Sequence, residues 1–145
     1  MTVARMITAG MAVSALLGFA GCVDTRGSLT GSAGRLEHNA NMLARDAGDE
    51  RTSSDYPSRF ARDAHELADD AHEFRNRAED RQATDADVKA AFERVSRSYH
   101  VVRDDVDRSD SRAARDDLKP VTDAYLDVER AMGGYPVRRA SIDDR

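Results

Sequence analysis

The chain has 145 residues, with 22 Lys and Arg residues against 27 Asp and Glu residues, and its formal net charge is -5 at pH 7. This length leaves room for one small domain. The acidic balance and the lack of a basic block argue against nucleic-acid binding, since neutralising phosphates needs clustered Lys and Arg side chains. Only 6% of the residues are aromatic and none is Trp, so the apolar content fits a small helical core better than a large one.

The first residues have the pattern of a secretion signal. Residues 1–5 carry one positive charge, and residues 6–20 form an uncharged apolar run. This run is shorter than the about 20 helical residues that cross a bilayer. The pattern therefore predicts a signal peptide over residues 1–21.

The end of this run is formed by Phe19, Ala20, Gly21 and Cys22. These residues resemble the lipobox of bacterial lipoproteins, in which an aliphatic residue, a small residue, and Gly or Ala precede a Cys. Phe19 departs from the Leu that is commonest at the first position. The resemblance covers the signal alone, and it implies that Cys22 is linked to diacylglycerol, that the chain is cut before it, and that the new amino terminus is acylated.

Cys22 is also the only Cys of the chain, so no disulfide can form within it. Lipidation explains this lone thiol, and the alternative is an ordinary secretion signal that leaves Cys22 free or removes it. Three acyl chains, as the resemblance implies, exceed what stable anchoring needs. We therefore expect membrane lipid as a partner and no cofactor besides the covalent lipid.

The predicted location is the periplasmic face of a bacterial membrane. Asp24 does not directly follow Cys22, and this pattern favours the outer membrane over the inner membrane in enterobacteria. The Gly, Ser and Thr residues after the Cys predict a tether over residues 22–28.

Four heptad patterns follow, in which apolar residues alternate in steps of four and three. Short polar connectors separate them, so the sequence predicts an all-α, antiparallel up-down-up-down four-helix bundle over residues 29–134 and a mobile tail over residues 135–145. The expected core seam consists of Leu36, Leu43, Phe60, Leu67, Phe74, Phe92, Val95, Tyr99, Val102, Leu118, Val121, Tyr125 and Val128.

The seams sort by side-chain size. The first two helices place Ala at heptad position a, whereas the third and fourth place mostly aromatic side chains or Leu there. Since dense packing sets large groups against small ones, we expect the aromatic rows to lie over the Ala rows. The hydroxyls of Tyr99 and Tyr125 then need hydrogen-bond partners.

Several residues predict the helix ends. Thr84 and Asp87 fit the start of the third helix. Gly48 and Gly133 fit the C-terminal ends of the first and fourth helices. Pro120 should kink the fourth helix or divide it in two.

The histidines offer one arrangement for a metal ion. His65, Asp69 and His72 lie at i, i+4 and i+7 along one stripe of the second helix, outside the seam. With water completing the shell, such a stripe can bind Zn²⁺, Cu²⁺ or Ni²⁺, and His100 is a further candidate. As solvated side chains on an exposed face, the same residues need no such role.

The segment from Asp105 to Asp116 echoes the calcium loop of EF-hands, but it lacks the Gly at position six and its first ligands would be helical. Helix capping by Ser109, Asp110 or Ser111 is the simpler interpretation. The sequence also shows no nucleophile motif, no glycine-rich phosphate loop and no inward carboxylate pair, so we expect no enzyme activity.

Together the patterns predict a membrane-anchored envelope lipoprotein that acts as a non-enzymatic interaction or structural module. Its partner would be another envelope protein or a second copy of the chain. One alternative is a periplasmic metal-binding or metal-sensing bundle that uses His65, Asp69 and His72. A third is that the first two helices open and expose their apolar seam to lipid or to unfolded proteins.

Overall fold

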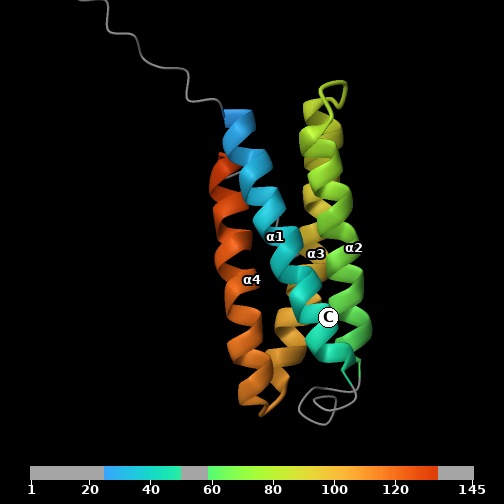
Figure 1. Cartoon of the computed structure of the whole chain (residues 1–145), viewed down its shortest axis with the longest axis vertical. Coiled ribbons are helices and arrows are strands. Elements are labelled where there is room, and N and C mark those ends of the chain that lie inside the picture. The colour runs from blue at the N-terminus through green and yellow to red at the C-terminus, as the bar shows by residue number, and fades with distance from the viewer. Residues whose placement is uncertain (1–24, 50–58, 134–145) are drawn as a thin grey trace, which may run out of the picture.

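The computed structural model describes residues 25–49 and 59–133. They form four helices, α1 (Thr25–Gly48), α2 (Phe60–Glu79), α3 (Asp85–Arg108) and α4 (Arg112–Ala131). The helices run alternately up and down, and α4 closes the bundle against α1 (Figure 1). This arrangement confirms the predicted all-α antiparallel four-helix bundle.

The two ends of the bundle are formed by different helix ends and connections. The start of α1, the connection between α2 and α3, and the end of α4 lie at one end, which we call the N-terminal end (Figure 1). The start of α2 and the end of α3 lie at the opposite end. Helix α1 begins four residues before Leu29, so the second half of the expected tether is helical. The predicted signal, Cys22 and the predicted tail lie outside the described residues.

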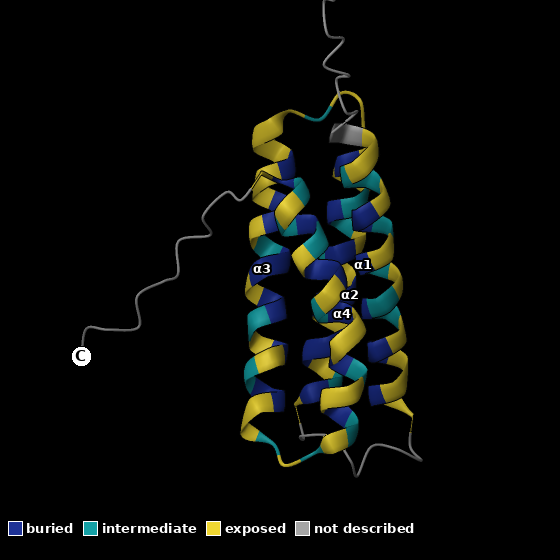
Figure 2. Ribbon diagram, turned by 90° about the vertical axis from the view of Figure 1, so that its left-hand side faces the viewer, coloured by how far each residue is buried: buried dark blue, intermediate teal, exposed yellow. Residues whose placement is uncertain are grey.

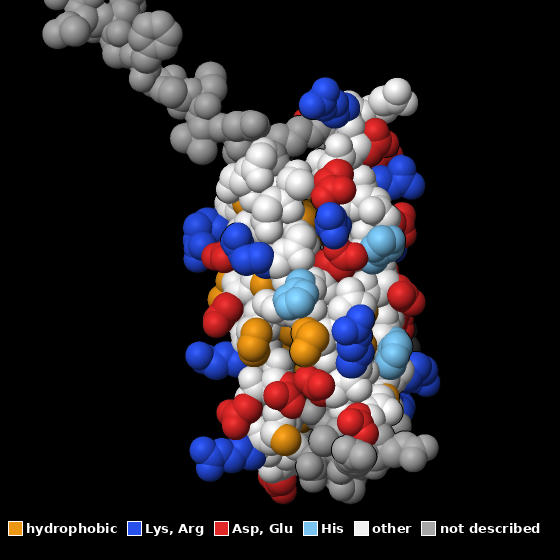
Figure 3. Space-filling model, in the orientation of Figure 1, with side chains coloured by type: hydrophobic (Ala, Val, Ile, Leu, Met, Phe, Trp, Pro, Cys, Tyr) orange, Lys and Arg blue, Asp and Glu red, His pale blue; other side chains and the backbone are white. Residues whose placement is uncertain are grey.

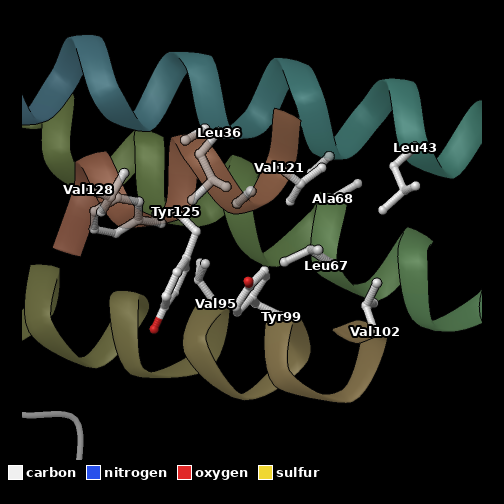
Figure 4. Packing of buried hydrophobic residues seen from close by; sticks show 14 of the residues in the cluster. Leu36, Leu43, Leu67, Ala68, Val95, Tyr99, Val102, Val121, Tyr125 and Val128 are labelled. Atoms are coloured by element: carbon white, nitrogen blue, oxygen red, sulfur yellow. The ribbon is translucent and has the colours of Figure 1, made fainter. Parts of the chain in front are cut away.

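Each helix buries one face along its length (Figure 2). Every side chain predicted for the core seam is buried, and these side chains interdigitate between the helices (Figure 4). Burying apolar surface is the main favourable contribution to folding, so this seam holds the bundle together. The heptad pattern therefore identifies the faces that pack.

Aromatic rings fill the space between α3 and α4. Among neighbouring helices, the backbones of α3 and α4 lie farthest apart, whereas those of α1 and α2 lie close together. The rings of Tyr99 and Tyr125 stack with their centroids 4.2 Å apart, and Phe92 lies 5.8 Å from Tyr125. The prediction that the aromatic rows lie over Ala rows did not include this stacking of ring on ring. Stacked rings gain free energy from packing against one another.

Both tyrosine hydroxyls have the partners that their burial requires. The Tyr99 hydroxyl donates to Thr122 Oγ1 at 3.1 Å, and Tyr125 shares a hydrogen bond with Ser96 Oγ at 2.9 Å. Burial raises the pKa of Tyr125, so its hydroxyl keeps its proton. These bonds satisfy polar atoms that would otherwise cost free energy inside the bundle.

The helix ends follow the predicted signals in most places. Thr84 and Asp87 form a capping box at the start of α3, and the Ser111 hydroxyl accepts from the backbone N–H of Ala114 at the start of α4. Gly133 has φ +75, the left-handed conformation expected after α4. Gly48 is the last residue of α1, at the C-terminal end where it was predicted, and it has no positive φ.

Helix α4 continues through Pro120. Of the two predicted outcomes, a kink or a division, the division is excluded, because α4 is unbroken from Arg112 to Ala131. Pro120 is exposed, so water can reach the backbone group that loses its partner. Asn39 Nδ2 of α1 donates to the Pro120 carbonyl at 2.9 Å, which ties α1 to α4.

Candidate functional site

The predicted metal stripe lies exposed on α2. His65 Nδ1 is 2.7 Å from the Ala61 carbonyl of its own helix, so it donates there. No three His, Cys, Asp or Glu side chains in residues 25–49 and 59–133 are grouped to hold a metal ion. The structure places His65, Asp69 and His72 on one helix without bringing them into a site.

His72 is engaged by a carboxylate of the neighbouring helix. Its Nδ1 lies 2.7 Å from Glu37 Oε1 of α1, and its Nε2 lies 3.0 Å from Asn76 Nδ2. Arg75 Nη1 donates to the second oxygen of Glu37 at 2.8 Å, and Arg75 Nε donates to Glu79. The Glu37 side chain, only 13% exposed, thereby links α1 to α2. Sequence reasoning missed this cluster because its members come from two helices.

The charge of Glu37 is stabilised in the fold. Burial raises the pKa of its carboxyl, but hydrogen bonds from Arg75 and His72 outweigh burial, and the pKa lies below its usual value. A carboxyl with a lowered folded pKa stabilises the fold above its unfolded pKa, about 4.3, and this contribution is lost as the pH falls through the folded value.

Glu37→Gln should therefore lower the melting temperature by a few degrees at pH 7, because the amide keeps the shape and loses the charge. The difference from the unchanged protein should shrink below about pH 4, where Glu37 itself takes up a proton. Thermal melts at pH 7 and pH 3 measure both effects, with the exposed Glu66→Gln of α2 as the control. Equal losses at both pH values would contradict the role of the charge.

His100 is more deeply placed than its heptad position predicts. It is half-buried on α3, and its ring centroid lies 5.4 Å from that of Tyr99 and 6.1 Å from that of Tyr125. His100 is thus part of the aromatic packing between α3 and α4. This contact explains its position without a metal ion.

Two carboxylates lie inside the bundle, against prediction. Asp63 of α2 is 6% exposed and Asp105 of α3 is 9% exposed. The prediction that the chain has no inward carboxylate pair was wrong. Each Asp directly precedes a seam residue, Ala64 or Val106, and so stands at heptad position g beside the buried face. Two acidic g residues near facing helix ends are the signal that could have revealed the pair.

The position of Asp105 argues against a calcium loop. Asp105 belongs to α3, which continues to Arg108, and its side chain is buried. Ser109 Oγ bonds back to Val106 and Ser111 caps α4, as the simpler interpretation predicts.

The outer surface carries mixed charge. On the face that α1 presents between α4 and α2, acidic and basic side chains alternate with histidines and a few apolar groups (Figure 3). Among the described residues, the exposed large apolar side chains are on three different helices: Met42, Val101 and Leu126. None of the described helices has the length and apolarity needed to cross a membrane.

Comparisons with known proteins do not assign the chain to a family. No family model matches it, and neither the curated proteins nor the solved structures contain a match.

Proposed function

We propose that the chain is a bacterial envelope lipoprotein, anchored through an acylated Cys22, whose bundle acts by binding another envelope protein or a second copy of itself. The observation that carries this proposal is the single Cys at the end of a lipobox-like run, three residues before α1 begins. An acylated Cys at that place needs no further anchor.

The short distance from Cys22 to α1 fixes the orientation in this proposal. Three residues span at most about 10 Å, so the N-terminal end of the bundle would lie next to the lipid headgroups. The opposite end and the sides of the helices would face the periplasm. A partner would therefore meet the mixed-charge faces and the Pro120 region.

Several charged side chains pair across neighbouring helices, which supports a binding role rather than catalysis. Arg35 of α1 pairs with Asp127 of α4 at 3.1 Å, and Arg94 of α3 pairs with Glu73 of α2 at 2.6 Å. Such exposed pairs join neighbouring helices but contribute little stability each. Like Glu37, these side chains connect helices of the bundle.

Mass spectrometry of the protein extracted from membranes tests the anchor. We expect the N-terminal peptide to begin at Cys22 and to carry the added mass of diacylglycerol and an acyl chain. Cys22→Ser should abolish this peptide and move the protein out of the membrane fraction, because Ser cannot form the thioether.

Cross-linking of the same cells tests the binding role. The unchanged protein should yield an adduct with a second envelope protein or a second copy, and Cys22→Ser should lose it because the bundle leaves the membrane surface. An unmodified N-terminus that begins away from Cys22 would contradict anchoring, whereas an anchored protein without adducts would contradict the binding role.

A further inference from the structure

The buried carboxylates of Asp63 and Asp105 face each other between α2 and α3. Asp63 stands in the first turn of α2 and Asp105 in the last turn of α3, so the pair lies at the end opposite the N-terminal end (Figure 1). A hydrogen bond with Asp63 and the negative charge of Asp63 both raise the pKa of Asp105, so the two carboxyl groups lie close together. Two carboxylates can form such a bond only when one of them holds a proton.

The arginines that contact the two carboxyl groups are exposed to solvent, which weakens their effect on the buried charges. Arg62 Nη2 lies 2.9 Å from Asp63 Oδ1, and Arg108 Nη1 lies 3.4 Å from Asp105 Oδ1. Both arginine side chains are mostly exposed, and the charge of Arg59 also acts on Asp105. These are the charged groups that act on the pair from α2 and from α3.

One oxygen of the pair lacks a donor. Among the described residues, none donates to Asp105 Oδ2, although this atom is buried. A buried acceptor without a partner costs about 1–3 kcal/mol, more when it is charged. A proton held between the two carboxyl groups removes this cost and one of the two charges together.

We propose that Asp63 and Asp105 share one proton and that this shared proton couples the packing of α2 against α3 to pH. While the proton is held, the pair forms a hydrogen bond between the helices. When it leaves to solvent, two carboxylates face each other in a buried place, and this end of the bundle loosens.

A proton fits this place better than a divalent cation. Ca²⁺ takes six to eight oxygen ligands and Mg²⁺ takes six, whereas the described part of the chain offers no third carboxylate or imidazole here. Arg62 and Arg108 already occupy one oxygen of each Asp, and their charges oppose a second cation.

The direction of the pH effect follows from the electrostatics. Burial raises the pKa of Asp105, the Asp63 carboxyl raises it further, and Arg59 and Arg108 only partly counteract them. Since the folded pKa of Asp105 lies above the unfolded value of about 3.9, the contribution of this group to stability is fully present below that pH. It is lost as the pH rises through the folded pKa.

Thermal melts of the detergent-purified protein from pH 3 to pH 8 test the proposal. Asp105→Asn imitates the protonated side chain, and its amide can donate to Asp63. We expect the variant to melt roughly 4 °C or more above the unchanged protein at pH 7. The two should converge near pH 3, where Asp105 is protonated in both the folded and the unfolded states.

Asp107→Asn is the matched control, because it removes the same charge from an exposed side chain two residues along α3. It should show no such gain at pH 7. A destabilised Asp105→Asn at pH 7, or a gain that is the same at every pH, would overturn the proposal.

Carbon NMR of the Asp carboxyl groups gives a second readout that does not depend on stability. Asp105 should titrate above the ordinary range of Asp, and Asp63→Asn should lower the pKa of Asp105. Titration of Asp105 in the ordinary range of Asp would refute the shared proton. A rise in melting temperature with Ca²⁺ or Mg²⁺ that Asp105→Asn abolishes would refute it in favour of a metal site.

Discussion

Replacing Phe92 by Ala should lower the free energy of unfolding by about 3–5 kcal/mol. Phe92 is 2% exposed, and its ring centroid lies 5.6 Å from that of Phe74 on α2 and 5.8 Å from that of Tyr125 on α4. Truncation leaves a cavity lined by rings from two other helices, which cannot all move inward. Because small domains are stable by only about 5–15 kcal/mol, the loss is a large share of the total.

Urea denaturation followed by circular dichroism measures this loss. Leu126→Ala is the control, since Leu126 is 45% exposed on α4 and its truncation should change stability by about 0.5 kcal/mol or less. Phe92→Leu keeps much of the ring's volume and should fall between the two. A loss from Phe92→Ala no larger than that from Leu126→Ala would show that the three rings do not form the centre of the core.

The buried faces could be predicted from the sequence because heptad spacing is a property of a single helix. Phe92 and Tyr125 fall on the seams of their helices whichever neighbours they meet, so their burial follows from the pattern alone. The capping box of Thr84 and Asp87 is local in the same sense, since both residues belong to one turn.

Contacts between helices could not be predicted this way. The stacking of Tyr99 on Tyr125 depends on how far α3 lies from α4, and no spacing within either helix reports that distance. The pairing of Glu37 with His72 joins residues 35 positions apart. Such partners become visible only when the helices are arranged in space.

The burial of the carboxylate pair could not be predicted from heptad spacing. Asp63 and Asp105 stand at g, a position that is exposed on an isolated helix and that a closely packed neighbour covers. Seam spacing tells which side chains face inward, but the separation of the helices decides how much of the flanking positions is buried. Cys22 differs again, because its assignment rests on a resemblance and lies outside the described residues.

The close approach of α1 and α2 depends on small seam residues, and Ala71→Leu should therefore lower the free energy of unfolding by about 1–3 kcal/mol. Ala71 is fully buried on α2, which packs against both α1 and α3. A larger side chain must push a neighbouring helix away or leave its preferred rotamer. Urea denaturation measures the loss.

Ala90→Leu is the matched control, because Ala90 is exposed on α3 and Leu is nearly as good a helix former as Ala. Its effect should stay within about 0.5 kcal/mol. An Ala71→Leu protein as stable as the unchanged one would mean that space remains beside Ala71 and that α1 and α2 do not need Ala to pack.

The same variant separates a closed seam from one that opens to lipid or unfolded proteins. If the seam is closed, the unchanged protein should not increase the fluorescence of a dye that binds apolar surface at pH 7, and Ala71→Leu should do so as its helices are forced apart. If α1 and α2 open readily, the unchanged protein should already bind the dye. Ala71→Leu should then lower the free energy of unfolding by less than about 1 kcal/mol. Dye binding and the unfolding free energy must therefore change together, since both follow from whether the Ala seam is packed.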